Sequence, residues 1–369
     1  MGLPGHATPE GTDRHRRRFA ARVADGHFRR FQELWLSSVG LGTYLGDEDA
    51  RTDEQYRGAV TRAIELGCNV LDSAINYRHQ RSERAVGEAL ALMVRAGRAA
   101  RDEIVVATKG GFVPFDGGYP PDPRAYFQET FVHPGIMRQE DLVAGCHCMT
   151  PAYLQHQLER SRQNLGLDCV DIYYLHNPET QLQEVPRDRF LPRLREAFAT
   201  LEGAVAQGRI RMYGTATWNG YRQPPSARDY LSLSELAALA REVGGPDHHF
   251  RVIQLPQRVV ATWDPHHGER LHPAGADGPG PPPARGRSAP WPHHRCAAGN
   301  PVRPVDPGPG GRPGRNEADC PCRREPGHRR RAAGPPGGPP ARVSPTRLTA
   351  RRGGMRCGRR PQDGRPWRR

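Results

Sequence analysis

Short apolar segments alternate with helix-patterned segments from residue 31 to residue 256, and this alternation limits the possible folds more than any other feature of the sequence. Six apolar runs have the composition of buried strands: Ser38–Tyr44, Asn69–Ala74, Glu103–Lys109, Val170–His176, Ile210–Thr217 and Phe250–Pro256. Strands that alternate with helices form βαβ units, and such units build a parallel sheet with helices packed on it. The sequence therefore predicts an α/β fold.

Five helical segments separate these runs, and capping residues mark several of their ends. Thr52-Asp53-Glu54-Gln55 has the pattern of a capping box that opens the first helix, and Gly67 closes it. Thr150-Pro151 is expected to start the third helix, with Gly166 just past its end. The remaining helices are expected over residues 80–97, 189–208 and 232–244.

Two architectures contain such units, an open doubly wound sheet and a (β/α)8 barrel. A dinucleotide-binding open sheet should show Gly-x-Gly-x-x-Gly directly after a strand. The nearest match, Gly40-Leu41-Gly42, lies inside the first run and lacks the third glycine, so the barrel is favoured. About six of the eight βα units are recognisable. We therefore expect an incomplete TIM-type barrel over residues 31–258, preceded by a disordered arm over residues 1–30.

The positive charge of the chain is concentrated in its last third. Residues 261–369 carry the whole formal net charge of +14, because they contain 22 arginines and 8 acidic residues. Residues 1–260 hold 32 basic and 32 acidic residues, so their charges balance. The same 109 residues contain 22 prolines and 18 glycines, above the share of roughly 25–30% that marks disordered chains. We expect residues 259–369 to form a disordered, low-complexity tail. The abrupt change of composition near residue 257 suggests a shift of the reading frame.

Other classes of protein are disfavoured by the sequence. The first 28 residues lack an apolar signal segment and no stretch approaches membrane-spanning length, so we expect a soluble cytoplasmic protein that does not contact a membrane. The eight cysteines form no pair of matched Cys-x2-Cys spacings, and we expect no metal site; Cys146-His147-Cys148 is interpreted as loop or packing. The oligomeric state is not predicted.

Lys109 is the only lysine in the chain, where the other 53 basic side chains are arginines. Lysine carries a compact charge on a thin stem, and a lone lysine in so arginine-rich a chain indicates a site that arginine does not fit. Functional residues of barrels lie at the carboxyl ends of strands. Those ends supply Asp72, Tyr77, Lys109, His176, Trp218 and Gln254. Trp218 is compatible with stacking on a ring or with packing.

These residue types can work together on a carbonyl group. An ammonium group beside a tyrosine stabilises tyrosinate and lowers the pKa of the hydroxyl, and a carboxylate keeps the ammonium charged and oriented. A histidine beside the tyrosine can hydrogen-bond the substrate oxygen. Together they form a general acid directed at a carbonyl.

Over residues 35–256 the sequence resembles the aldo-keto reductase superfamily. The matching stretches are Gly40–Tyr44, Asn69–Tyr77, Val105–Lys109, Val170–His176 and Val252–Pro256. The resemblance implies a (β/α)8 barrel that transfers hydride between a nicotinamide cofactor and a carbonyl or alcohol substrate. The cofactor is usually NADPH, with NAD possible.

The resemblance also implies roles for individual residues. By position, Tyr77 is the proton donor, Asp72 and Lys109 form its pKa-tuning pair, and His176 orients the substrate. The residues expected at the cofactor are Gly42, Thr43, Tyr44, Thr217 and Gln254.

The sequence departs from the family pattern in two places. Ala216 stands where the family has a hydrogen-bonding side chain, with Thr217 as its substitute. The seventh and eighth βα units, which grip the phosphate end of the cofactor in the family, are not recognisable, so weak or absent activity is expected. The insertion Gly110–Met149 is expected to be a long loop that shapes the substrate pocket, and its aromatic residues favour an apolar or ring-bearing ligand.

Two alternative functions remain open. One is a binding protein whose basic tail contacts nucleic acid; the absence of lysine, tyrosine and phenylalanine from that tail argues against it. The other is a non-catalytic barrel that senses the redox state of nicotinamide for a partner.

Overall fold

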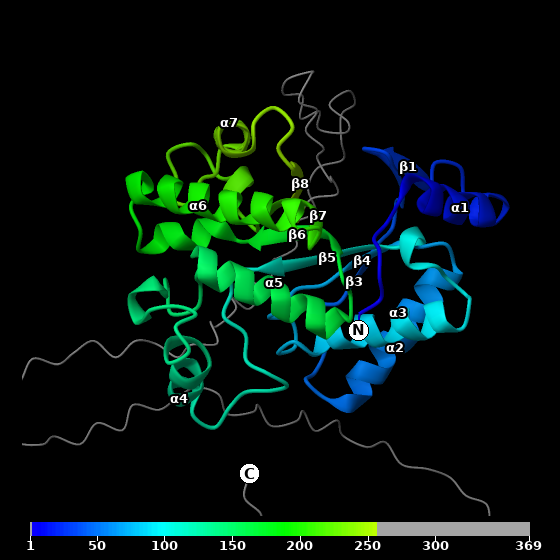
Figure 1. Cartoon of the computed structure of the whole chain (residues 1–369), viewed down its shortest axis with the longest axis horizontal. Helices are drawn as coiled ribbons and strands as arrows, with labels where there is room; N and C mark the ends of the chain where they lie inside the picture. The colour runs from blue at the N-terminus through cyan, green and yellow to red at the C-terminus, as the bar shows by residue number, and fades with distance from the viewer. Residues whose placement is uncertain (1, 257–369) are drawn as a thin grey trace, which may run out of the picture. The chain divides into compact units, whose positions relative to one another are not determined.

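A six-stranded parallel sheet forms the centre of the protein (Figure 1). The computed structural model describes residues 2–256, and all structural statements below concern these residues. The strands lie side by side in chain order: β3 (Leu41–Gly42), β4 (Val70–Asp72), β5 (Val105–Gly110), β6 (Val170–His176), β7 (Ile210–Ala216) and β8 (Phe250–Gln254). Every neighbouring pair is parallel. The predicted parallel α/β fold is confirmed.

The strand order follows the winding of a barrel, because a doubly wound sheet reverses its strand order at a switch point. Within the described residues β3 and β8 are the two edges, so this part of the sheet is not closed. The predicted tail over residues 259–369, and the proposed change of reading frame at its start, lie outside the described residues.

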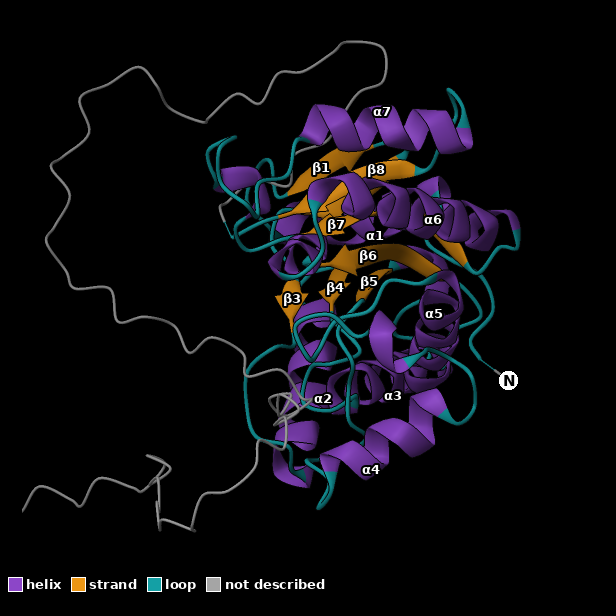
Figure 2. Cartoon of the chain, turned by 90° about the vertical axis from the view of Figure 1, so that its left-hand side faces the viewer, coloured by secondary structure: helices purple, strands orange, loops and turns teal. Residues whose placement is uncertain are grey.

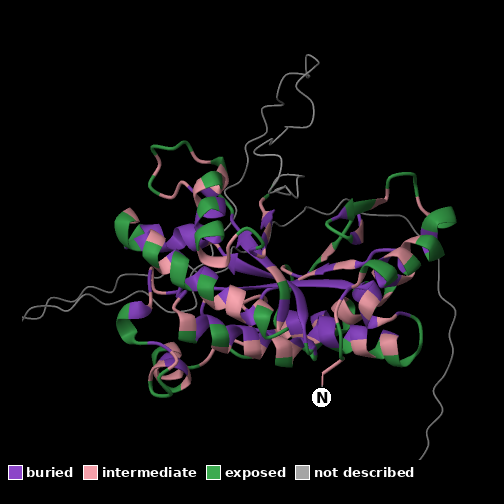
Figure 3. Cartoon of the chain, turned by 45° about the horizontal axis from the view of Figure 1, so that its top comes forward, coloured by how far each residue is buried: buried purple, intermediate pink, exposed green. Residues whose placement is uncertain are grey.

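Alternate residues of each strand enter two different apolar clusters, as expected for a period of two. Val106, Tyr173 and Leu175 pack against the helices on one face of the sheet. Those helices are α2 (Ala50–Glu65), α3 (Arg81–Arg95), α5 (Pro151–Leu165), α6 (Arg187–Ala206) and α7 (Leu233–Gly244). Figure 2 shows them flanking the strands, and Figure 3 shows that the centre of the sheet is buried; every residue of β5 and β6 is buried.

Val105 and Ile172 belong to the second cluster, on the opposite face. An antiparallel hairpin of β1 (Phe28–Phe31) and β2 (Leu34–Ser37) contributes Phe31 and Leu34 to it. Tyr173 and Tyr174, both expected in the core, are buried on opposite faces. No helix within residues 2–256 combines the length and apolar composition needed to cross a bilayer.

The expected helices are present, with one difference at the start of the first. α2 begins at Ala50, and the Asp49 carboxylate accepts from the backbone N–H of Thr52 at 2.7 Å. The predicted capping box at Thr52 is therefore wrong, because an aspartate three residues earlier already caps the helix. At the other end, Gly67 has φ +97°, a conformation that favours glycine.

The expected disorder of residues 1–30 is also wrong. Residues Pro9–Phe19 form helix α1, with Thr8 as its N-cap. Two arginines of this helix bind the fully buried carboxylate of Glu103: Arg14 Nε at 2.8 Å and Arg18 Nη1 at 3.0 Å. Arginines of the segment that we expected to be disordered thus neutralise a buried charge.

The insertion over residues 110–149 follows β5, where it was predicted, but it is not a structureless loop. It contains the short helix α4 (Pro123–Phe127), which continues into a π-helical turn, η3 (Gln128–Val132). Phe127, Phe131 and Met137 form a separate apolar cluster with Tyr153 of α5. This core gives the insertion a fixed structure at the carboxyl end of the sheet.

Candidate active site

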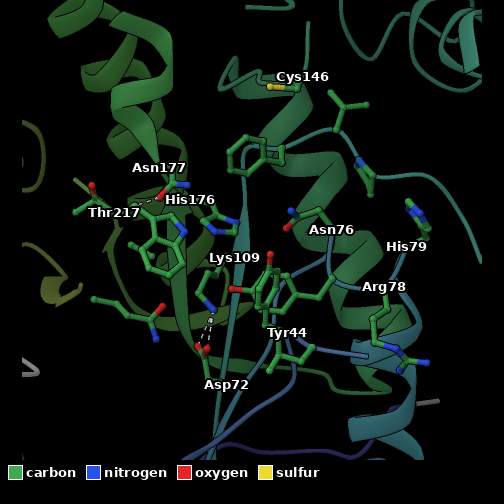
Figure 4. Close-up of a pocket in the computed structure, with 18 of the residues that line it drawn as sticks. Tyr44, Asp72, Asn76, Arg78, His79, Lys109, Cys146, His176, Asn177 and Thr217 are labelled. Carbon is green, nitrogen blue, oxygen red and sulfur yellow. Dashed lines mark hydrogen bonds and ion pairs between the residues drawn. The ribbon is translucent and has the colours of Figure 1, made fainter. Parts of the chain in front are cut away.

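A cavity of about 680 Å³ opens at the carboxyl ends of the strands (Figure 4). The register of the sheet places the strand-end side chains on one face. Asp72 lies opposite Ala107 of β5, and Lys109, two residues further along β5, points to the same face as Ala107. On the neighbouring strands, His176 lies opposite Ala216, and Ala216 lies opposite Gln254. All four predicted catalytic residues line this cavity: Asp72, Tyr77, Lys109 and His176.

Lys109 is enclosed at the bottom of the cavity, with only 1% of its surface exposed. Its ammonium group donates to both carboxylate oxygens of Asp72, at 2.8 and 2.7 Å, and to the carbonyl oxygen of Ser73 at 2.7 Å (Figure 4). Burial alone lowers the pKa of Lys109, but the neighbouring Asp72 and Tyr77 raise it above its ordinary value. Lys109 is therefore charged at neutral pH.

Tyr77 lies directly beside this ion pair. The Lys109 ammonium nitrogen is 4.9 Å from the centre of the Tyr77 ring. The Tyr77 ring meets the His176 ring edge-on, with 5.9 Å between their centres. The chain thus brings together residues that are up to 104 positions apart in the sequence.

The expected lowering of the Tyr77 pKa is not observed as a net effect. Burial raises the pKa of Tyr77, the Lys109 charge and hydrogen bond lower it, and the pKa lies above its ordinary value. The prediction from residue types counted the ammonium but not the loss of water around the phenol. Loss of water disfavours the charged form of any acid.

The residues expected at the cofactor fall into two groups. Tyr44, Thr217 and Gln254 line the cavity. Gly42 and Thr43 are not among the residues that line it: Gly42 pairs with Asp72 in the sheet, and Thr43 is buried with its hydroxyl 3.1 Å from the Asp72 carbonyl oxygen.

Thr217 does not offer its hydroxyl proton to a ligand. The hydroxyl donates to the Glu179 carboxylate and accepts from the Gly220 backbone N–H at 2.8 Å. These bonds fix the turn that follows β7. Since a hydroxyl has one proton to give, Thr217 is left to replace a side chain at Ala216 only as an acceptor.

Two asparagines of the cavity wall were missed in the sequence. Asn177 follows His176, takes φ +45° and accepts from the Trp218 backbone N–H at 3.2 Å. Its place between a strand end and a proline was an available signal, because Asn-Pro marks a turn. Asn76 precedes Tyr77, and its Oδ1 is buried without a hydrogen-bond partner among the described residues. Nothing in the sequence pattern distinguished Asn76.

The aromatic residues around the cavity have different roles. Trp218 is 46% exposed on the cavity wall and is not part of the core. Of the aromatic residues in the insertion, Phe112 and Tyr119 line the cavity, whereas Phe127 and Phe131 are buried in the cluster of the insertion itself. Within residues 2–256 no group of three metal-binding side chains is present.

Comparison with known proteins gives a consistent match. The family model described as "Aldo/keto reductase family" matches residues 38–230. An NADH-specific methylglyoxal reductase of Escherichia coli strain K12 is 28% identical over 55% of this chain and 54% of its own length. An NADP(+) aldo-keto reductase of Schizosaccharomyces pombe is 26% identical over 49% of this chain and 41% of its own length.

Solved structures are similar over a comparable part of the chain. An aldo/keto reductase from Klebsiella pneumoniae, solved in complex with NADP and acetate, is 22% identical. It covers 62% of this chain and 57% of its own chain, with a TM-score of 0.38. The chain spans about half the length of the curated relatives it matches.

Proposed function

The chain belongs to the aldo/keto reductase family, and on this premise we propose that it transfers hydride between a nicotinamide cofactor and a small carbonyl or alcohol substrate. Its relatives include NAD(P)H-dependent oxidoreductases. The proposal rests on one observation above all: Tyr77, the Lys109–Asp72 ion pair and His176 meet in one cavity.

The cavity suits the nicotinamide end of NADPH, or of NADH as the alternative. The amide side chains of Asn177 and Gln254 match the hydrogen-bonding groups of a carboxamide, and the exposed face of Trp218 suits a planar ring. When bound, the cofactor supplies or accepts the hydride. The units that hold the phosphate end of the cofactor in the family are not recognisable in the sequence, and the chain after residue 256 lies outside the described residues.

Tyr77 supplies the proton in the direction of reduction. Its hydroxyl gives a proton to the substrate oxygen as that oxygen gains negative charge, and the tyrosinate left behind is stabilised by the Lys109 ammonium. Asp72 holds Lys109 charged and in place. His176, at the end of β6, hydrogen-bonds the substrate oxygen and orients it toward Tyr77. In the direction of oxidation Tyr77 accepts the proton again.

We also propose the class of substrate. Phe112, Tyr119, Leu45 and Trp218 contribute apolar surface to the wall of the cavity. Such a wall suits aromatic or other apolar aldehydes and ketones.

Replacing Tyr77 by phenylalanine removes the proton donor and keeps the ring. We expect Tyr77→Phe to lower the rate of carbonyl-dependent NADPH oxidation by about 10²–10⁴-fold, the range for loss of a general acid. Tyr119→Phe is the matched control, because it removes a hydroxyl from the same cavity at an exposed position. Equal rates for Tyr77→Phe and wild type would contradict the proposal.

The same assay measures how firmly the cofactor is held. We propose that this chain binds NADPH weakly, because the units that grip the phosphate end in the family are not recognisable in its sequence. The rate should therefore keep rising with NADPH concentration well beyond the micromolar range. Half-saturation at low micromolar NADPH would show that this part of the proposal is wrong.

A further inference from the structure

His147 lies behind His176 and has no place in the proposed chemistry. It belongs to the insertion after β5, is fully buried and does not line the cavity. Its Nε2 is 2.8 Å from the backbone carbonyl oxygen of His176. A buried imidazole that does not reach the cavity can act only through the residues it contacts, and His176 is the one of these that belongs to the proposed chemistry.

The protonation of His147 is fixed by a chain of hydrogen bonds. Arg193 donates from Nη1 to the Gln181 side-chain oxygen at 2.8 Å. Since a guanidinium cannot accept, the amide nitrogen of Gln181 must face the other way, and it lies 2.9 Å from His147 Nδ1. His147 Nδ1 therefore accepts, and the ring proton sits on Nε2, where it donates to the His176 carbonyl.

The surrounding backbone is shaped around this contact. Gly111 has φ +136°, and a Cβ atom there would lie 2.7 Å from His147 Nε2 and 3.1 Å from the His176 carbonyl oxygen. The Phe112 ring contacts both histidine rings and meets each at nearly a right angle, with 5.2 Å between ring centres to His147 and 5.0 Å to His176. Gly111 and Phe112 thus pack closely around the contact between His147 and His176.

We propose that His147 is a positioning residue: its Nε2–H group holds the end of β6 so that the His176 ring faces Tyr77. The inference rests on the proposed function, in which His176 orients the substrate oxygen. It assigns a role to the insertion beyond shaping the pocket. The insertion supplies the donor, and Gln181, on the turn directly after β6, supplies the group that fixes the tautomer.

Two substitutions separate the hydrogen bond from the packing. His147→Gln places an amide nitrogen near the position of Nε2 and keeps the donor. His147→Phe keeps an aromatic ring and removes the donor. We expect His147→Phe to lower kcat by about 10- to 100-fold, because a small displacement of a positioning group has effects of that size. KM for NADPH should be unchanged, and His147→Gln should recover most of kcat.

A purely structural role would give a different pattern. Both variants would then lose thermal stability. The loss of kcat in each variant would match its loss of stability, whether or not the side chain at position 147 offers a donor. Wild-type kcat in His147→Phe, or equal loss of kcat in both variants while both remain folded, would overturn the proposal.

A second readout does not depend on turnover. Nitrogen-15 NMR of the histidine rings, assigned by His147 and His176 substitutions, should show His147 as the neutral tautomer with the proton on Nε2. The ring signals of His176 should shift in His147→Phe and stay near their wild-type positions in His147→Gln. A proton on Nδ1 of His147, or unchanged His176 signals in His147→Phe, would overturn the proposal even in a chain that reduces no carbonyl.

Discussion

Individual side chains at strand ends carry most of the proposed chemistry. Lys109 donates to three oxygen atoms that lie around it, two from Asp72 and one from Ser73. An ammonium group has three hydrogens and can point them in three directions, whereas a guanidinium presents its donors in one plane. This geometry gives a physical reason for a lone lysine among 53 arginines.

The pH dependence of stability provides a test at the scale of one residue. Burial lowers the pKa of His147 from 6.5 to about 4. Between these values the unfolded chain binds a proton that the folded chain excludes, so the free energy of unfolding falls as pH falls from about 6.5 to 4. The decrease due to His147 reaches about 3 kcal/mol.

Denaturant unfolding at several pH values, compared between wild type and His147→Gln, isolates this contribution. The variant has no titrating group at position 147, so its stability should fall less steeply over the same interval. Parallel curves for the two proteins would show that His147 does not carry the expected pH dependence.

The catalytic candidates could be predicted from the sequence because each stands at or just after the end of an apolar run. Asp72, Lys109 and His176 are at such ends, and Tyr77 follows five residues after one of them. His147 and Asn76 could not be predicted in the same way. Their roles depend on contacts with residues distant in the sequence, and no local pattern indicates which side chain a loop residue meets. The net pKa of Tyr77 likewise depends on burial, which residue types do not give.

At the scale of whole elements, α1 is held to the sheet by charge. The carboxylate of Glu103 is fully buried just before β5, and it accepts from Arg14 and Arg18 of the helix. Burial alone raises the pKa of Glu103, but these arginines and the Ala100 backbone N–H hold it below its ordinary value. The helix is thus part of the folded body and not an arm.

Removing both arginines should destabilise the protein. Arg14→Ala combined with Arg18→Ala leaves the buried carboxylate without the partly exposed cations that bind it. Loss of the partners of a buried polar group lowers the free energy of unfolding by roughly 1–3 kcal/mol. Arg17→Ala is the matched control on the same helix, because Arg17 is exposed and its one ion pair within residues 2–256 is with Asp13. We expect the control to change stability by less than about 0.5 kcal/mol. Equal denaturation midpoints for the double variant and the control would refute this account of α1.

The sequence predicted most elements because period and capping residues act locally. The five expected helices and six expected strands are present, and Gly67 and Gly166 end helices as expected. The predictions of a disordered arm in place of α1 and of a structureless loop in the insertion were wrong for the same reason. Arg14 lies 89 residues from its partner Glu103, and the core of the insertion needs Tyr153 of α5, so neither element is stable from its own segment alone.

At the scale of the molecule, parallel strands in chain order bring the ends of β4, β5, β6, β7 and β8 to one cavity. The alternation of strands and helices was sufficient to predict this arrangement, since βαβ units wind in one direction. Closure of a barrel was not derivable in the same way, because it depends on two further units that the sequence after residue 256 does not display.

Transfer of hydride to a carbonyl carbon is the central claim, and isotope transfer measures it most directly. NADPH that carries deuterium at the transferable position is incubated with this chain and an aromatic aldehyde, and the alcohol is analysed by mass spectrometry. The account predicts that the wild-type chain forms an alcohol with one deuterium on the carbinol carbon. Tyr77→Phe should form at most a trace of this labelled alcohol over the same time. An alcohol formed without deuterium, or no alcohol at saturating NADPH, would contradict it.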